Sequence, residues 1–229
     1  MLNLKNVTLV ILSSIKLDES IKALEYSCRG INFGAVKLVS HEKPNNLPPN
    51  IKFEYIDKMN SIDEYSYNII YKLGGYFETE FVLVIQPDGY VVNPSSWRNE
   101  FLEYDYIGAP WSLPNDNFSY RDTKGNLFRV GNGGFSLRSK KLVDLPNKLG
   151  LEWKSFHGFY NEDGYICVNY RHIFEENGMR YAPLDVAKYF SHESYIPEIE
   201  GITPFGFHGK SSKWNNIDEV NTIGNNWLK

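Results

Sequence analysis

A single aspartate follows the most apolar segment of the chain. Residues 81–85 read FVLVI, and Gln86, Pro87 and Asp88 come directly after them. An aspartate at the end of a buried strand is held rigidly, and a divalent cation bound there, Mg or Mn, could neutralise a diphosphate. We therefore predict that Asp88 binds a metal ion and that Gln86 lies beside the bound ligand. Pro-Asp-Gly is also a frequent turn tripeptide, which leaves a structural role open.

Three glycines surround Asn132 in the string VGNGGFSLRSK. Glycine lets the backbone approach a ligand closely and leaves amide groups unobstructed, so we predict that Gly133 and Gly134 contact a ligand. The spacing is neither a dinucleotide-binding fingerprint nor a P-loop. A tight turn leading into a strand is the alternative, although such a turn seldom needs three glycines and an asparagine together.

Two adjacent carboxylates, Glu162 and Asp163, stand at the start of a predicted helix in the string NEDGYIC. A carboxylate held in a fixed position can act as a general base that takes the proton from a hydroxyl group. A helix start also favours negative charge through the backbone dipole, so helix capping is the alternative. We predict that Asp163, with Glu162 beside it, is the base.

A histidine is followed by glycine and two lysines in the string FGFHGKSSKW. An imidazole can complete the shell of a metal ion, and a lysine can bind a diphosphate. We predict that His208 binds the metal and that Gly209, Lys210 and Lys213 contact the phosphates. A structural histidine is the alternative.

Short apolar runs predict the strands that must position these groups. They lie at residues 7–12, 35–39, 52–56 and 81–85, and segments with helical spacing alternate with them. This alternation indicates a mostly parallel central sheet with helices on its faces, an α/β fold.

Ligands of such sheets bind at the carboxyl ends of the strands. Ser13 and Asp57 stand at two of these ends, and we predict that both bind the ligand. The best-marked helix begins at the capping-box pattern of Ser61 and Glu64 and ends at Gly74-Gly75.

The second half of the chain is less regular. Residues 112–129 are polar and rich in Asn and Asp, which predicts a mobile loop, and long loops in compact domains are often lids. We predict strands at 135–137 and 205–208, and a helix from Asn161 to about Asn177 with Gly178 as its cap. The tail from about residue 215 is predicted to be loosely held.

Composition excludes several classes of protein. The 229 residues suit one domain, and the net charge of −4 without a cluster of Lys and Arg argues against nucleic acid as the partner. The only cysteines, Cys28 and Cys167, have no metal-binding spacing and are predicted to be buried thiols. The apolar run VTLVIL is too short to span a membrane, and no signal-peptide cleavage site follows it. We therefore expect a cytoplasmic protein without a transmembrane segment.

Several strings together resemble a known family. QPDGYVVNPSSW, FLEYDYIGAPW, VGNGGFSLRS, the Glu-Asp pair, FSHE and FGFHG occur in this order between about residues 61 and 209. The series resembles a bacterial and viral glycosyltransferase-like family. The resemblance implies a GT-A-like, Rossmann-like fold over residues 1–229, a single α/β domain with a mostly parallel sheet flanked by helices.

The resemblance also implies roles for residues of this chain. Asp88 is similar to the second acid of the Asp-x-Asp metal motif, and Gln86 stands where that motif has its first acid. Asp163 with Glu162 is similar to the pair that supplies the base in inverting enzymes. The segment from His208 is similar to the metal- and diphosphate-binding segment of glycogenin-like enzymes, with altered spacing.

The activity implied is transfer of a sugar from a nucleotide-diphosphate sugar to an acceptor hydroxyl, with inversion, in glycan biosynthesis. UDP is the expected nucleotide, by analogy with the wider fold. Two alternatives remain open. One is a sugar nucleotidyltransferase, which the absence of a glycine-rich loop after residues 7–12 disfavours, and the other is a non-catalytic carbohydrate- or nucleotide-sugar-binding module.

Overall fold

A six-stranded mixed sheet forms the centre of the molecule. The computed structural model describes residues 1–155 and 161–209. Four neighbouring strands are parallel, and the fifth in the order is antiparallel to both of its neighbours. The spatial order is β3 (Lys52–Tyr55), β2 (Ile31–Ser40), β1 (Leu2–Leu12), β4 (Phe81–Ile85), β7 (Phe135–Ser139) and β6 (Tyr106–Ile107). The predicted parallel arrangement is confirmed.

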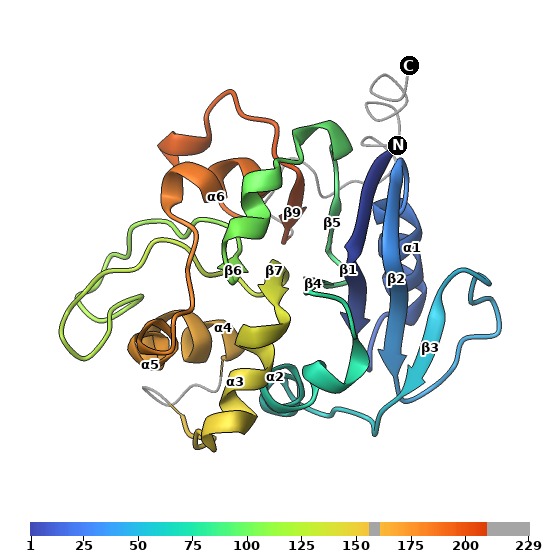
Figure 1. The fold of residues 1–229 in the computed structure, drawn as a ribbon, viewed down its shortest axis with the longest axis horizontal. Coiled ribbons are helices and arrows are strands. Elements are labelled where there is room, and N and C mark those ends of the chain that lie inside the picture. The colour runs from blue at the N-terminus through green and yellow to red at the C-terminus, as the bar shows by residue number, and fades with distance from the viewer. Residues whose placement is uncertain (156–160, 210–229) are drawn as a thin grey trace.

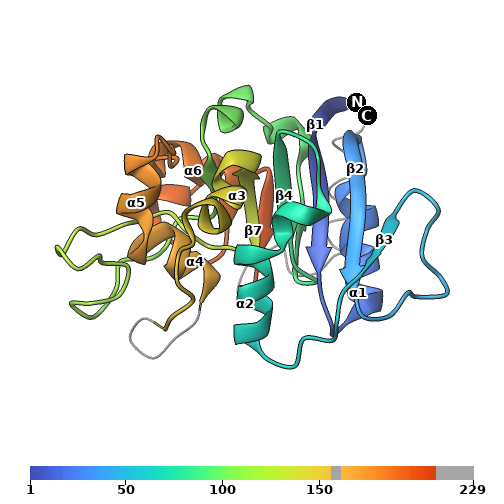
Figure 2. The ribbon, with the colours of Figure 1, turned by 60° about the horizontal axis from the view of Figure 1, so that its bottom comes forward.

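Alternate residues of the central strands enter two separate cores. Leu9 and Ile11 of β1 pack in the core on one face, whereas Val10 and Leu12 pack in the core on the other face. Both faces of β1 are therefore covered, which explains why its sequence is continuously apolar instead of alternating. α1 (Leu17–Ser27) covers one face, and α2 (Ile62–Tyr71) and α3 (Lys140–Leu149) cover the other (Figures 1 and 2).

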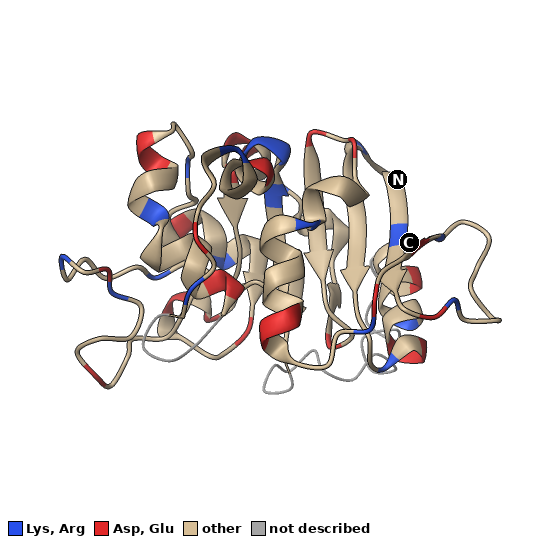
Figure 3. Ribbon diagram, turned by 90° about the horizontal axis from the view of Figure 1, so that it is seen from below, with Lys and Arg blue, Asp and Glu red and all other residues tan. Residues whose placement is uncertain are grey.

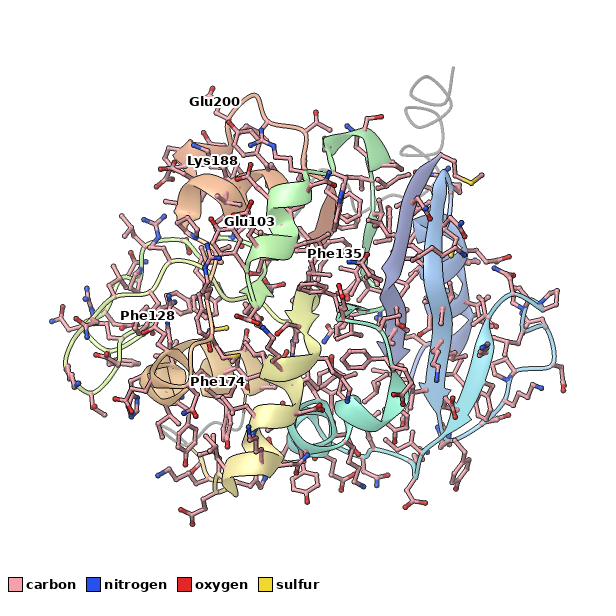
Figure 4. The ribbon with its side chains drawn as sticks, in the orientation of Figure 1. Glu103, Phe128, Phe135, Phe174, Lys188 and Glu200 are labelled. Atoms are coloured by element: carbon pink, nitrogen blue, oxygen red, sulfur yellow. The ribbon has the colours of Figure 1, made fainter. Side chains whose placement is uncertain are left out.

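A small second sheet packs against the central one. Its order is β5 (Gly89–Val91), β9 (Gly206–His208) and β8 (Ser191–His192). Phe135 of β7 lies between the two sheets, in the interior of the molecule (Figure 4). A Cβ atom on Gly206 would lie 2.0 Å from the Phe135 ring, so the glycine is what lets the sheets approach this closely.

The start of α2 agrees with the sequence prediction, and its end does not. Ser61 accepts a hydrogen bond from the Glu64 amide, which confirms the helix cap. The helix ends at Tyr71, and Gly74 and Gly75 lie inside the 3₁₀ turn Leu73–Tyr76 that follows. The glycines therefore do not end the helix.

The helix predicted from Asn161 to Asn177 is broken into three pieces. They are α4 (Glu162–Gly164), a π-helical turn (Tyr165–Asn169) and α5 (Arg171–Glu176). In the π-helical turn the Tyr170 amide donates to the Tyr165 carbonyl, five residues back. Gly178 follows with φ +82°, the left-handed conformation predicted for the cap.

Two helices of the structure, α3 and α6 (Leu184–Phe190), were not predicted from the sequence. α3 was not predicted because Pro146 lies inside it, and proline usually interrupts a helix. Ser139 caps this helix by accepting a hydrogen bond from the Leu142 amide. α6 is only seven residues long, too short to show a clear period. Both cysteines are free, with Cys167 buried and Cys28 partly buried. Within the described residues no helix is long and apolar enough to cross a membrane.

Candidate active site

A pocket of about 420 Å³ opens at the carboxyl ends of β1 and β4, which lie at the lower edge of the sheet in Figure 2. This volume lies within the range of small-molecule sites. The predicted ligand-binding residues Ser13, Gln86 and Asp88 all line it. The remaining lining residues are Leu12, Ser14, Ile15, Lys16, Met59, Asn60, Ser61, Ile62, Tyr65 and Pro87.

The turn after β1 is fixed by its own serines. The Ser13 hydroxyl donates to the Ile15 carbonyl at 2.5 Å and accepts from the Ile15 amide at 3.2 Å. The Ser14 hydroxyl accepts from the Met59 amide at 2.9 Å, which ties this turn to the segment before α2. Lys16 follows with φ +52° and exerts its charge on Asp88. The turn therefore brings a cation to the wall that carries Asp88.

His208 is the centre of a polar cluster beside this pocket. Its Nε2 lies 3.0 Å from Oε1 of Gln86 and 3.4 Å from Oδ1 of Asp88. On the other side of the ring, Nδ1 lies 3.3 Å from Nδ2 of Asn132 and 3.5 Å from Oε1 of Glu193. Asn132 also donates to Glu193 at 2.7 Å. Because Gln86 and Asp88 line the pocket as well, the cluster forms part of its wall.

The two carboxylates around His208 stabilise its protonated form. Burial lowers the pKa of His208, but the hydrogen bonds to Asp88 and Glu193 outweigh burial and raise the pKa to about 9. The same hydrogen bond from His208 holds the pKa of Asp88 below its usual value. At neutral pH the cluster is therefore a cation between two anions.

Metal binding by Asp88 and His208 stays a prediction, and the chemistry of the atoms in the cluster bears on it. An imidazole nitrogen, a carboxylate oxygen and an amide oxygen meet where His208, Asp88 and Gln86 converge, a set that Mn accepts. In the described part of the chain, however, no group of three His, Cys, Asp or Glu side chains is arranged around a metal position. A metal would have to replace the proton that these atoms share.

A buried ion pair lies behind the cluster. Nη2 of Arg138, on β7, donates to Oε2 of Glu162 at 2.9 Å, and the two side chains are 0% and 7% exposed. Nε of Arg138 donates to the Ser136 hydroxyl at 2.9 Å. Burial raises the pKa of Glu162 to about 7, against the opposing charge of Arg138. Glu162 is thus held by Arg138 and is poorly placed to accept a proton from a ligand.

Asp163 is in a different position from its neighbour. It is only half-buried and forms no ion pair within the described residues; its Oδ1 accepts from the Gly164 amide at 2.7 Å. Burial raises the pKa of Asp163, and the negative charge of Glu193 adds to this effect. Both predicted bases have a raised pKa, but only Glu162 is engaged in an ion pair within the described residues.

The glycines around Asn132 make room for the protein's own side chains. A Cβ on Gly133 would lie 1.6 Å from Oε1 of Glu162, and one on Gly134 would lie 2.3 Å from Nε2 of His208. The contact of Gly133 and Gly134 with a ligand stays a prediction. They allow Glu162 and His208 to pack directly on the backbone.

The other predicted residues have mixed outcomes. Asp57 follows β3, at the edge of the sheet, and lines a different pocket. Gly209 takes a φ of +94°, and its amide donates to the Asp88 carbonyl at 3.0 Å, so it fixes the turn after β9. Lys210 and Lys213 lie outside the described residues, as does the predicted loose tail.

Sequence reasoning missed three residues of the site. Glu193 belongs to the FSHE string, but nothing local marked it as a partner of His208. Tyr65 accepts a hydrogen bond from Nε2 of Gln86 at 2.9 Å, and no motif pointed to it. Arg138 could have been found from the sequence, because a charged residue in a buried strand requires a partner of opposite charge.

Comparison with known proteins places the sequence in a family. The model of a family described as "Protein of unknown function (DUF5672)" matches residues 50–208. The chain belongs to this family. The match includes the strands, loops and helices that carry Asp88, Asn132, Glu162, Asp163 and His208. No curated protein matches the sequence.

Solved structures similar to this DUF5672 chain include several transferases. An active-site mutant of LgtC has a TM-score of 0.54 and 11% identity, over 96% of this chain and 95% of its own. A glycosyltransferase involved in glycosylation of the major capsid of PBCV-1 has a TM-score of 0.47 and 16% identity, over 95% of this chain and 97% of its own. The Pyrobaculum calidifontis mannosyltransferase PcManGT, bound to GDP-Man and Mn²⁺, has a TM-score of 0.43 and 9% identity, over 91% of this chain and 58% of its own. Nucleotidyltransferases also occur among the similar structures. The fold is that of GT-A glycosyltransferases.

Proposed function

We propose that this protein transfers a sugar from a nucleotide-diphosphate sugar to an acceptor hydroxyl. The observation that carries the proposal is the position of Asp88, which belongs both to the wall of the 420 Å³ pocket and to the cluster around His208. A donor bound in the pocket would therefore have its diphosphate beside the predicted metal-binding residues. The GT-A fold supports the same conclusion.

The residues of the pocket have distinct tasks in this proposal. Ser13 and the turn after it border the nucleotide, and Lys16 attracts the negatively charged phosphates. Asp88 and His208, with Gln86 beside them, would hold Mg or Mn. That ion would supply positive charge to the departing diphosphate. Lys210 and Lys213 remain predicted phosphate contacts.

Asp163 is the proposed general base. It would take the proton of the acceptor hydroxyl as that oxygen attacks the anomeric carbon in line, with inversion. Burial raises the pKa of Asp163, which makes proton transfer to its carboxylate more favourable. The pair of Glu162 and Arg138 keeps the start of α4 in place and so positions Asp163.

The partners proposed here are a nucleotide sugar, with UDP as the expected nucleotide, and a glycan or other hydroxyl acceptor. The net charge of −4 argues against nucleic acid as the partner. Lys and Arg are interspersed with Asp and Glu over the face seen in Figure 3, without a continuous basic stripe. A binding module without activity and a nucleotidyltransferase are the rival functions. The turn after β1 reads SSIK and lacks the glycines that favour the second.

Product analysis separates these functions. The protein is incubated with candidate UDP- and GDP-sugars, Mn and a panel of glycan acceptors, and in a parallel reaction with nucleotide triphosphates and sugar phosphates. The products are identified by chromatography. Release of free nucleotide diphosphate with a glycosylated acceptor supports the proposal. Pyrophosphate released from nucleotide triphosphate and sugar phosphate identifies a nucleotidyltransferase instead, and nucleotide binding without any product identifies a binding module.

Asp88→Asn should weaken the binding of UDP in the presence of Mn by about tenfold or more. The substitution removes the carboxylate charge on which the predicted metal depends, while it keeps the size of the side chain. Calorimetric titration with and without Mn measures the effect. The control is Glu200→Gln, which neutralises an exposed carboxylate that lines neither pocket (Figure 4). Equal affinity of wild type and Asp88→Asn would reduce Asp88 to a turn residue.

The loop at residues 112–129 is predicted to close over the bound substrates. It projects from the left of the molecule in Figure 1, and Tyr120 within it stacks on Trp111 at 4.4 Å. Burial raises the pKa of Tyr120, and the negative charges of Glu193 and Asp163 add to this effect, so the Tyr120 hydroxyl lies within electrostatic range of the proposed base. Closing loops commonly exclude water from reactive sugars.

Limited digestion with trypsin tests the closure of this loop. Donor should slow cleavage after the exposed Lys124, while cleavage after Lys148, exposed near the end of α3, should continue at the same rate. Equal slowing at both sites would indicate general stabilisation by the ligand. Unchanged cleavage at Lys124 would exclude closure.

A further inference from the structure

A second pocket, of about 330 Å³, lies beside the donor pocket on a neighbouring face of α2. The end of β3 and the segment after it form one wall, α2 forms another, and Trp153 forms the third. Met59 lines both pockets. The lining residues are Ile56, Asp57, Lys58, Met59, Asp63, Glu64, Tyr67, Asn68, Lys72 and Trp153. The proposed transferase chemistry uses none of them for donor or base, apart from the shared Met59.

Two aromatic side chains give this pocket an apolar surface. The rings of Tyr67 and Trp153 meet edge to face, with centroids 5.8 Å apart and an angle of 80°. Tyr67 remains 39% exposed, whereas Trp153 is anchored against Tyr71 and Tyr165. A half-exposed ring on a fixed aromatic support offers a flat apolar face to a ligand at little cost in conformational freedom.

Hydrogen-bonding groups surround these rings. Asp57, Asp63 and Glu64 are exposed carboxylates, which accept hydrogen bonds from hydroxyl groups. Asn68 is 7% exposed; its Nδ2 donates to the Glu64 carbonyl at 2.7 Å, and its Oδ1 has no hydrogen-bond partner among the described residues. The hydrogen bond to the Glu64 carbonyl fixes the Asn68 side chain within this wall.

The charge of the lining excludes phosphate as the ligand. Three carboxylates, Asp57, Asp63 and Glu64, face two lysines, Lys58 and Lys72, which leaves one net negative charge. An anionic group would be repelled by this excess. An apolar ring face surrounded by acceptors and a few donors is instead complementary to a neutral molecule with many hydroxyl groups.

We propose that this pocket binds a neutral saccharide, the part of a glycan acceptor that lies beyond the reacting sugar. Ile62 and Tyr65 of α2 line the donor pocket, and Asp63, Glu64, Tyr67 and Asn68 of the same helix line the second pocket. An acceptor that fills the second pocket while its reacting sugar lies at the donor must therefore be longer than a single sugar. The saccharide's role as acceptor rests on the proposed transferase function, whereas its binding does not.

Saturation-transfer NMR on the full-length protein tests the binding directly. The probes are maltose, cellobiose, lactose and N,N′-diacetylchitobiose, each without donor. At least one of them should receive saturation from the protein. Tyr67→Ala should weaken that binding by about tenfold, because it removes the exposed ring, and Tyr67→Phe should retain most of it. Tyr195→Ala removes a ring that is 70% exposed elsewhere on the surface and should leave the affinity unchanged.

The outcomes separate this inference from the transferase proposal. UDP affinity is measured on the same variants, and Tyr67→Ala should bind UDP as wild type does, which also shows that it is folded. Saccharide binding that depends on Tyr67 in a protein without turnover would support the pocket and reject the transferase. If none of the four saccharides receives saturation, or if Tyr67→Ala binds as tightly as wild type, the saccharide site is rejected even where transfer is detected.

Discussion

Replacing Asp163 with asparagine is expected to lower kcat by roughly 10²–10⁴-fold, the range for a lost general base. The amide keeps the size of the side chain and can still accept from the Gly164 amide, but it cannot take up a proton. The affinity for UDP with Mn should not change, because the donor pocket does not include Asp163. Steady-state kinetics with the donor and acceptor found by product analysis, together with calorimetry for UDP, measure both quantities.

Glu162→Gln is the informative comparison for this variant. Because Glu162 is paired with Arg138, its neutralisation leaves a buried guanidinium without a counter-charge and should lower the melting temperature. Asp163→Asn should melt close to wild type, because Asp163 forms no ion pair within the described residues and asparagine can still accept from the Gly164 amide. Near-normal turnover of a folded Asp163→Asn variant would show that the Glu-Asp pair acts only in helix-start electrostatics.

Replacing Arg138 with methionine is expected to destabilise the fold by about 3–5 kcal/mol, the cost of breaking a buried ion pair from one side. The Glu162 carboxylate would remain buried without its partner. A carboxyl whose pKa is raised on folding binds more protons in the folded state, so the stability it contributes is lost as pH rises. The loss in free energy of unfolding caused by Arg138→Met should therefore become smaller as pH falls. Urea unfolding at several pH values measures this.

Two controls identify the source of that defect. The double variant Arg138→Met/Glu162→Gln removes both charges and should recover part of the lost stability, with less dependence on pH. Lys188→Met breaks an ion pair at the surface, where Asp185 is 88% exposed, and should cost at most about 1 kcal/mol. If Arg138→Met lowers the free energy of unfolding no more than Lys188→Met does, the assignment of Arg138 and Glu162 as a buried ion pair is contradicted.

The features predicted most accurately from the sequence are those that depend on a short stretch of chain, such as a buried strand and the residues that follow it. The apolar run at 81–85 is β4 to the residue, and the rule that ligands bind at the carboxyl ends of parallel strands placed Ser13, Gln86 and Asp88 on one pocket wall. Asp57, which follows the edge strand β3, lines the second pocket and not the donor pocket. Its contact with a ligand stays a prediction.

Contacts between distant segments were beyond sequence reasoning. Asn132 meets Glu193 across 61 residues, and Arg138 meets Glu162 across 24. The glycines at 133 and 134 were predicted to let a ligand approach closely, whereas the structure shows Glu162 and His208 packed against them. The π-helical turn Tyr165–Asn169 was equally hidden, because nothing in its composition distinguishes it from an ordinary helix.

The hydrogen bond between Gln86 and His208 joins residues 122 positions apart, and this separation governs when the site forms during synthesis. At about 5–20 residues per second, a ribosome needs roughly 6–24 s to travel from one to the other. The four parallel strands leave the ribosome well before β9 does. A nascent chain can therefore assemble its sheet while Asp88 still lacks His208, and the proposed activity should appear only after the last strand has docked.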